Sequence, residues 1–192
     1  MKIFISLCVL FAFQLLQVES LSGTCNSFER EKLNEGYKPC VYTDTLGHPT
    51  VGIGFNLDRA DARRKLSAVG ADYDQVRAGR ACLSSYQIQK LFTDDMANAV
   101  SCASSWLSSI WWQMSSDKQS AVADMVFNMG CSRLRKFRNM KAALEKQDYR
   151  KAAVEMRNSR WCTQVKSRCN RNISCMNGAL ATLMRMLGLK YF

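Results

Sequence analysis

The sequence predicts an α+β fold that is mostly helical, and two observations predict it. Between Cys40 and Phe55 the apolar residues alternate with period two around the turn residues Leu46-Gly47-His48-Pro49, which indicates a β-hairpin or short antiparallel sheet. Beyond Cys82 the apolar residues recur at helical spacing almost throughout. We therefore expect a small N-terminal lobe with the hairpin, a long connecting helix and a larger helical C-terminal lobe, with a functional cleft between the lobes.

The N-terminal lobe, about residues 25–81, begins with a short helix. Asn26-Ser27 can cap this helix and Gly36 can end it. A third short strand after Asn56 stays open, because the composition of residues 58–68 is more typical of a helix. In the strand that follows the turn, alternate residues share a face, with Val51, Ile53 and Phe55 on one side and Gly52 and Gly54 on the other.

The connecting helix covers about residues 84–103, and Ser84 or Ser85 can cap it. The C-terminal lobe, about residues 104–192, starts with a second apolar stripe that ends at Gly130. Shorter helices are expected around residues 137–145, 148–157 and 177–187. Three tryptophans are expected to fill the core of this lobe: Trp106, Trp111 and Trp112.

Residues 1–20 are typical of a secretory signal peptide. Lys2 gives a positive start, residues 3–16 are an apolar run, and Val18-Glu19-Ser20 offers small residues for cleavage. The run is too short for a comfortable membrane span. We therefore expect cleavage and an extracellular, secreted protein of residues 21–192, with a retained signal anchor as the alternative. Cleavage removes Cys8 and leaves eight of the nine cysteines.

An even number of cysteines in an exported chain indicates disulfide bonds, although the sequence does not choose among the possible pairings. A zinc site is the competing interpretation, but the chain has a single histidine, His48, and no Cys-x-x-Cys pair. We therefore predict disulfides and no metal. The tripeptide Asn172-Ile173-Ser174 is a weak signal for glycosylation of Asn172.

The net charge of +11 favours anionic partners such as bacterial cell walls or acidic membranes. Nucleic acid is not expected as a partner of an exported protein. Part of the charge is clustered between Arg133 and Arg138, where the simplest interpretation is a solvated face. The length suffices for one compact domain with its own core, and we expect a monomer.

Two carboxylates before the turn carry the candidate chemistry. Glu35 directly precedes the expected helix end, where the helix dipole and burial would raise the pKa of its carboxyl group. Asp44 lies beside the turn, where a carboxylate is hydrated and stays ionised. Two acids in such different environments can take opposite proton-transfer roles, which is the arrangement that hydrolyses glycosidic bonds.

Thr50 completes this candidate group. If the five residues 45–49 connect the strands, Asp44 and Thr50 form a cross-strand pair with Cβ atoms about 4.5–5.5 Å apart, which can hold one water. A four-residue connection would put the two on opposite faces. Gly52 and Gly54 present no side chain on the face of the pair, so they either let a bulky polymer approach or serve tight packing alone.

The chain resembles the phage-type lysozymes, the family of the T-even bacteriophage enzyme. The likeness to their active-site signature rests on Glu35-Gly36, Tyr42-Thr43-Asp44-Thr45 and Thr50-Val51-Gly52-Ile53-Gly54, whose spacing matches without a gap. It continues, in the family's order, through segments 89–92, 124–130 and 158–161. The resemblance therefore covers nearly all of the chain that follows the signal peptide.

This resemblance implies a lysozyme that hydrolyses the β-1,4 bond after N-acetylmuramic acid in bacterial peptidoglycan, with inversion and without a cofactor, for defence or digestion of bacteria. Glu35 takes the position of the general acid, and Asp44 and Thr50 take the positions that orient and activate the attacking water. Further residues match the lining of the active-site cleft or the basic partner of the catalytic glutamate: Phe127, Asn128 and Phe137 for the lining, and Arg168 for the partner.

Two alternatives stay open. One is a cationic membrane-active antimicrobial or toxin-like protein in contact with anionic membranes, which the charge and the apolar stripe of residues 178–187 would suit, although such a stripe is more typical of ordinary core. The other alternative is hydrolysis of chitin oligomers, because chitin shares the N-acetylglucosamine backbone and no residue can be shown to read the lactyl ether of muramic acid.

Overall fold

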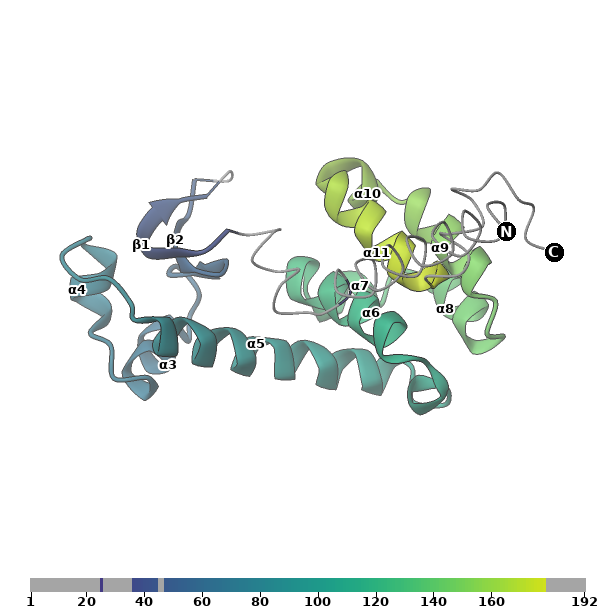
Figure 1. Cartoon of the computed structure of the whole chain (residues 1–192), viewed down its shortest axis with the longest axis horizontal. Coiled ribbons are helices and arrows are strands. Elements are labelled where there is room, and N and C mark those ends of the chain that lie inside the picture. Colours follow the sequence, from purple (N-terminus) through teal and green to yellow (C-terminus); the bar gives the residue numbers. More distant parts are fainter. Residues whose placement is uncertain (1–24, 26–35, 45–46, 179–192) are drawn as a thin grey trace, which may run out of the picture. The chain divides into compact units, whose positions relative to one another are not determined.

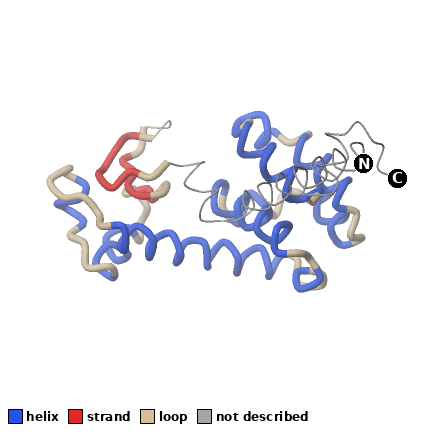
Figure 2. Tube along the Cα trace, viewed as in Figure 1, coloured by secondary structure: helices blue, strands red, loops and turns tan. Residues whose placement is uncertain are grey.

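The computed structural model describes Cys25, residues 36–44 and residues 47–178. The expected signal peptide, the expected helix before Gly36 with Glu35, and the tail beyond Gly178 lie outside these residues. The described part has the predicted α+β organisation, with its strands near the N-terminus and helices after them (Figures 1 and 2). It forms two compact units, one within Arg30–Asn98 and the other made of Cys25 and the residues from Ala99 onward.

A three-stranded antiparallel sheet lies in the first unit. Its strands are β1 (Lys38–Thr43), β2 (Pro49–Gly52) and β3 (Phe55–Asn56), and they follow one another in the order β1-β2-β3. Across β1 and β2, Tyr42 pairs with Thr50 and Thr43 pairs with Pro49. The third strand covers Phe55–Asn56, and the described chain beyond Asn56 continues to a helix, Ala62–Ala68, which agrees with the helical composition of that segment rather than with a strand after Asn56.

The chain reverses direction between β2 and β3, where the alternation predicted one continuous strand. Val51 pairs with Phe55 across this turn, and Gly52 and Gly54 both have a φ of +68°. A positive φ strains any residue with a Cβ atom, so glycine suits both positions. A Cβ added to Gly52 would lie 3.2 Å from the Ile88 side chain. Gly52 thus packs tightly against a helix, and tight packing is one of the two interpretations that the sequence left open for it.

Helices α3 (Ala62–Ala68), α4 (Tyr73–Arg77) and the first half of α5 (Ser85–Trp106) complete the first unit. The start of α5 has a reciprocal capping box, because Ser84 N–H donates to Gln87 Oε1 at 2.9 Å and Gln87 N–H donates to Ser84 Oγ at 3.3 Å. The apolar residues form a buried core that includes Val51, Phe55, Leu57, Leu66, Val76 and Ile88.

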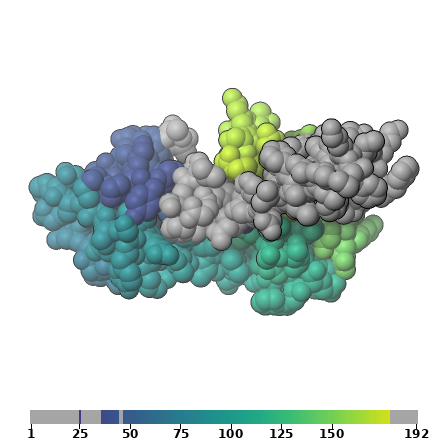
Figure 3. Space-filling view, in the orientation of Figure 1, coloured from purple at the N-terminus to yellow at the C-terminus, as the bar shows by residue number. Residues whose placement is uncertain are grey.

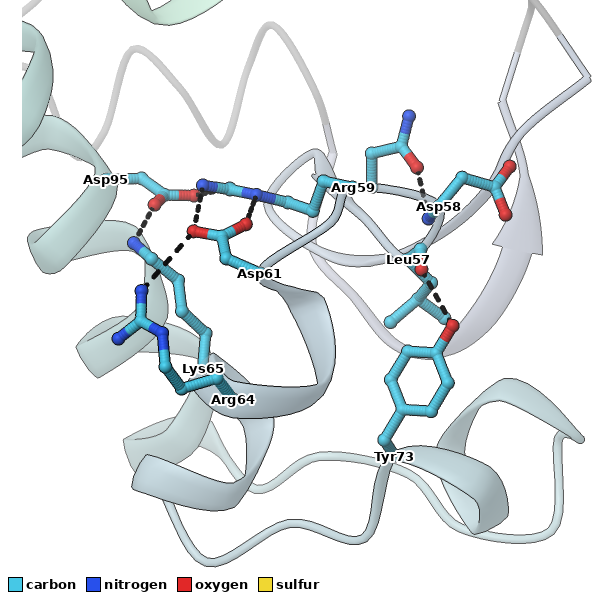
Figure 4. Close-up of polar contacts among 9 residues, drawn as sticks. Leu57, Asp58, Arg59, Asp61, Arg64, Lys65, Tyr73 and Asp95 are labelled. Carbon is cyan, nitrogen blue, oxygen red and sulfur yellow. Dashed lines mark hydrogen bonds and ion pairs between the residues drawn. The ribbon is translucent and has the colours of Figure 1, made fainter.

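A charged cluster ties the loop before α3 to α5 (Figure 4). Arg59 Nε donates to Asp61 at 2.6 Å, and Arg59 Nη1 donates to Asp95 at 2.5 Å. Lys65, on α3, also donates to Asp95. The guanidinium of Arg59 lies 5.0 Å from the centroid of the buried Phe55 ring, so the cluster closes one side of the core.

The described part of the second unit is helical. Its elements are the end of α5, a 3₁₀ helix η1 (Trp111–Gln113), α6 (Ser116–Met129), α7 (Cys131–Leu134), α8 (Arg138–Glu145), α9 (Tyr149–Arg157), α10 (Arg160–Val165) and α11 (Ser167–Asn177). Helix α11 packs against α6 and α9, and α8 packs against α9. Helix α6 ends at Gly130 as expected, whereas α10 and α11 were not predicted.

The tryptophans divide between the core and the surface. Trp106 and Trp111 are buried, as the sequence predicted for all three. Trp112 is 85% exposed, so its assignment to the core is wrong. Trp111 and Trp112 are consecutive in the short helix η1, where neighbouring side chains point in different directions.

Four disulfide bonds join the eight cysteines outside the expected signal peptide: Cys25–Cys175, Cys40–Cys82, Cys102–Cys131 and Cys162–Cys169. The first of them, together with a 2.7 Å hydrogen bond from Ser120 Oγ to the Cys25 carbonyl, places Cys25 with the second unit rather than with the N-terminal lobe. Each disulfide typically stabilises a fold by about 2–4 kcal/mol. None of the helices within the described residues is long and apolar enough to cross a membrane.

Candidate active site

Asp44 and Thr50 are both anchored to the backbone of one residue, His48. Asp44 Oδ1 accepts a hydrogen bond from His48 N–H at 2.8 Å, and the Thr50 hydroxyl donates to the His48 carbonyl at 3.1 Å. The Asp44 N–H donates to the same carbonyl at 2.9 Å. The peptide groups of His48 therefore bind both a carboxylate and a hydroxyl.

The register corrects the predicted pairing of these two residues. Thr50 lies opposite Tyr42, and the Asp44 N–H bond places Asp44 opposite His48. Asp44 and Thr50 are thus diagonal neighbours rather than a directly opposed pair. The period of two still assigns them to one face of the hairpin, and diagonal neighbours are about 7–8 Å apart, somewhat less between Cβ atoms.

The two anchored side chains differ in exposure. Thr50 is buried, whereas Asp44 is only partly buried. The strand β1 beside them is largely exposed, and its purple atoms lie on the visible surface in Figure 3. A hydroxyl whose hydrogen is donated to a carbonyl presents its lone pairs to other donors. The Thr50 oxygen is therefore left to act as a hydrogen-bond acceptor.

The ring of His48 extends this arrangement away from the sheet. His48 Nδ1 lies 3.1 Å from Asp58 Oδ2, and Arg77 Nη2 donates to Asp58 Oδ1 at 2.6 Å. These contacts with Arg77 and His48 hold the pKa of the Asp58 carboxyl below its ordinary value. From the sequence, His48 was identified as a turn residue and, because it is the single histidine, as evidence against a zinc site. No pattern in the sequence pointed to its contact with Asp58.

The expected cleft residues Phe127, Asn128 and Phe137 belong to the second unit. Phe127 and Asn128 are consecutive on α6, and Phe137 directly precedes α8. Both phenylalanines are partly buried and Asn128 is exposed. Asn128 Oδ1 accepts a hydrogen bond from the buried Trp161 indole at 2.8 Å. Its carbonyl end is thereby held by α10, and its amide NH₂ is the end that can donate to a ligand.

Arg168 is buried and bonded to a carboxylate that the sequence analysis did not single out. Arg168 Nη2 donates to Asp124 Oδ1 at 2.9 Å, and Arg168 Nε lies 3.2 Å from both carboxylate oxygens. Asp124 is fully buried on α6. A buried arginine and aspartate require each other, because either charge alone is costly in an apolar interior.

Asn172 belongs to the same buried network. Its Nδ2, the atom that a glycan would modify, donates to Asp124, and the residue is fully buried. A glycan at this atom is incompatible with the folded network, so the weak glycosylation signal at Asn172 does not correspond to an accessible site. Glu35, the expected general acid, lies outside the described residues.

Comparisons with known proteins agree with this arrangement. Residues 32–173 match the phage lysozyme family. The chain is 35% identical over 150 residues to the probable T4-type lysozyme 2 of Dictyostelium discoideum, and 30% identical over 150 residues to the probable T4-type lysozyme 1 of that organism. Each match covers 74% of this chain and 88% of the relative.

A third relative is a larger phage protein. The chain is 30% identical over 152 residues to the pre-baseplate central spike protein Gp5 of Enterobacteria phage T4, a match that covers 74% of this chain and 26% of that protein. The family match spans both described units, including the hairpin with Asp44 and Thr50 and the helices with Asn128 and Arg168. The chain therefore belongs to the phage lysozyme family and is a glycoside hydrolase.

Proposed function

We propose that this chain is a secreted bacteriolytic lysozyme that hydrolyses the β-1,4 bond between N-acetylmuramic acid and N-acetylglucosamine in peptidoglycan, with inversion. The observation that carries the proposal is the anchoring of the Asp44 carboxylate and the Thr50 hydroxyl on the backbone of His48. Membership of the phage lysozyme family supports the substrate class. The four disulfides support secretion, because such bonds persist in oxidising compartments.

In the proposed reaction, Glu35 donates its proton to the leaving glycosidic oxygen as that bond to the anomeric carbon breaks. A water held by Asp44 and Thr50 attacks the anomeric carbon from the opposite face and gives its proton to Asp44. The Thr50 hydrogen is directed at the His48 carbonyl, so the Thr50 oxygen acts as an acceptor and orients the water. Attack opposite the leaving group inverts the configuration.

The residues of the second unit are assigned to substrate binding. The amide NH₂ of Asn128 can donate to an acetamido carbonyl of the glycan, because its other end is held by Trp161. The partly buried Phe127 and Phe137 can pack against sugar faces. Arg168 is assigned as a supporting residue for Glu35, with its guanidinium fixed by Asp124.

A substrate panel tests the proposed specificity. We expect the purified protein to release reducing ends and soluble fragments from peptidoglycan much faster than from chitin oligomers, and to cause no dye leakage from anionic liposomes. The same panel is run with Asp44→Asn as the control for contaminating hydrolases. Faster release from chitin would overturn the peptidoglycan assignment, and leakage that persists in Asp44→Asn would favour the membrane-active alternative.

A further inference from the structure

We propose that His48 and Asp58 form a positioning pair that fixes the strand connection on which Asp44 and Thr50 depend. This inference rests on the proposed function, because it assigns a role in the same hydrolysis. Neither residue is placed in contact with substrate. Their role is to hold the backbone to which the two water-positioning side chains are bonded.

His48 is the shared anchor of Asp44 and Thr50. Its N–H bonds the Asp44 carboxylate, and its carbonyl accepts from both the Asp44 N–H and the Thr50 hydroxyl. A displacement of the His48 peptide groups would therefore move both side chains together. Such a displacement would separate them from the water and from the anomeric carbon at the same time.

The ring of His48 is tied through Asp58 to helix α4 of the first unit. Asp58 Oδ2 lies 3.1 Å from His48 Nδ1, and Asp58 Oδ1 lies 2.6 Å from Arg77 Nη2 on α4. Arg77 Nη1 also donates to the Tyr73 hydroxyl at 3.1 Å, and that hydroxyl donates to the Leu57 carbonyl at 2.9 Å (the Tyr73–Leu57 contact is visible in Figure 4).

These contacts lead back to the hairpin. The N–H of the buried Leu57 donates at 2.8 Å to the carbonyl of Pro49, which is the residue directly after His48. His48 is thus held from two sides, by the backbone of its neighbour Pro49 and through its own ring. Asp58 is the member that joins the ring to α4, and without it the ring would lose that link.

The contact between His48 and Asp58 is partly exposed to solvent. The side chains of His48 and Asp58 are 45% and 38% exposed. Partly exposed ion pairs of this kind add little to folding stability. A role in holding the overall fold is therefore a weak explanation for the pair, whereas small displacements of reacting groups have large effects on rate.

The test compares His48→Ala, Asp58→Ala and the double variant in steady-state hydrolysis of a soluble peptidoglycan fragment. His48→Asn serves as rescue, because Asn Nδ2 branches from Cγ as His Nδ1 does and can donate to Asp58. Lys90→Ala is the matched control, since it removes an exposed 2.7 Å ion pair with Asp94 in the same unit. Circular dichroism and thermal unfolding verify the fold of each variant.

We expect kcat to fall by about tenfold to about 100-fold in both single variants, with KM changed by less than about twofold. The double variant should lose no more than the worse single variant, His48→Asn should recover most of kcat, and Lys90→Ala should match the wild type. If His48→Ala does not fold, the kcat values of Asp58→Ala and His48→Asn test the positioning role by themselves.

Wild-type kcat in Asp58→Ala, or losses that multiply in the double variant, would overturn the positioning role. So would a rise in KM at unchanged kcat, which would instead assign His48 to substrate binding. A wild-type protein that cleaves no peptidoglycan would defeat the proposed function. That failure is distinguishable, because it appears before any variant is compared.

Discussion

Replacing Glu35 with glutamine is expected to abolish measurable lysis, with peptidoglycan hydrolysis reduced by roughly 10²–10⁴-fold, the usual contribution of a general acid. Glutamine keeps the size of the side chain but has no carboxyl proton to give to the leaving oxygen. The hairpin with Asp44 and Thr50 would still position water, yet the glycosidic oxygen would have to leave without a proton. The measurement is the initial rate of reducing-end release.

Glu145→Gln is the matched control for this variant, because it makes the same chemical change at an exposed position at the end of α8. It should retain the wild-type rate. The thermal unfolding midpoints of both variants should agree with that of the wild type. A fully active Glu35→Gln protein would refute the assignment of the general acid.

Replacing Asp124 with alanine is expected to lower the free energy of unfolding by about 3–5 kcal/mol, the usual cost of removing one partner from a buried ion pair. Asp124 is fully buried and accepts hydrogen bonds from Arg168 and Asn172, which are also buried. Its removal takes this acceptor away from two buried donors. Because these residues join α6 to α11, the loss should appear as a lower midpoint of chemical denaturation, with the disulfides kept oxidised.

An exposed pair in the same unit provides the comparison. Glu145 lies 3.2 Å from Lys141 on α8, and both side chains are about 40% exposed. Glu145→Ala should cost no more than about 1 kcal/mol. Equal destabilisation by the two variants would show that burial does not distinguish these ion pairs, and the structural importance assigned to Asp124 would then be wrong.

The parts of the fold that could be predicted from the sequence have local causes. The capping residue Ser84 and the apolar stripe that follows it specify α5. Gly130 ends α6, because its positive φ does not continue a right-handed helix. The hairpin also follows from its turn residues. The alternation through Ile53 was misleading, because Val51, Ile53 and Phe55 are all buried although the chain turns between them.

What could not be predicted depends on contacts between distant residues. A loop length does not determine which residues pair, so the diagonal relation of Asp44 and Thr50 needed the register. The disulfide connectivity and the carboxylate of Asp124 beneath Arg168 likewise depend on packing. The same holds for His48, whose partner Asp58 lies beyond the next two strands.

The most direct test of the account is the configuration of the sugar that is formed first. Proton NMR of a fresh digest of a soluble peptidoglycan fragment follows the anomeric proton of the new reducing end before mutarotation. Attack by a water held at Asp44 and Thr50 predicts that the α-anomer appears first from the β-linked substrate. A β-anomer, which indicates a covalent intermediate, or a non-reducing product from intramolecular attack would contradict the account.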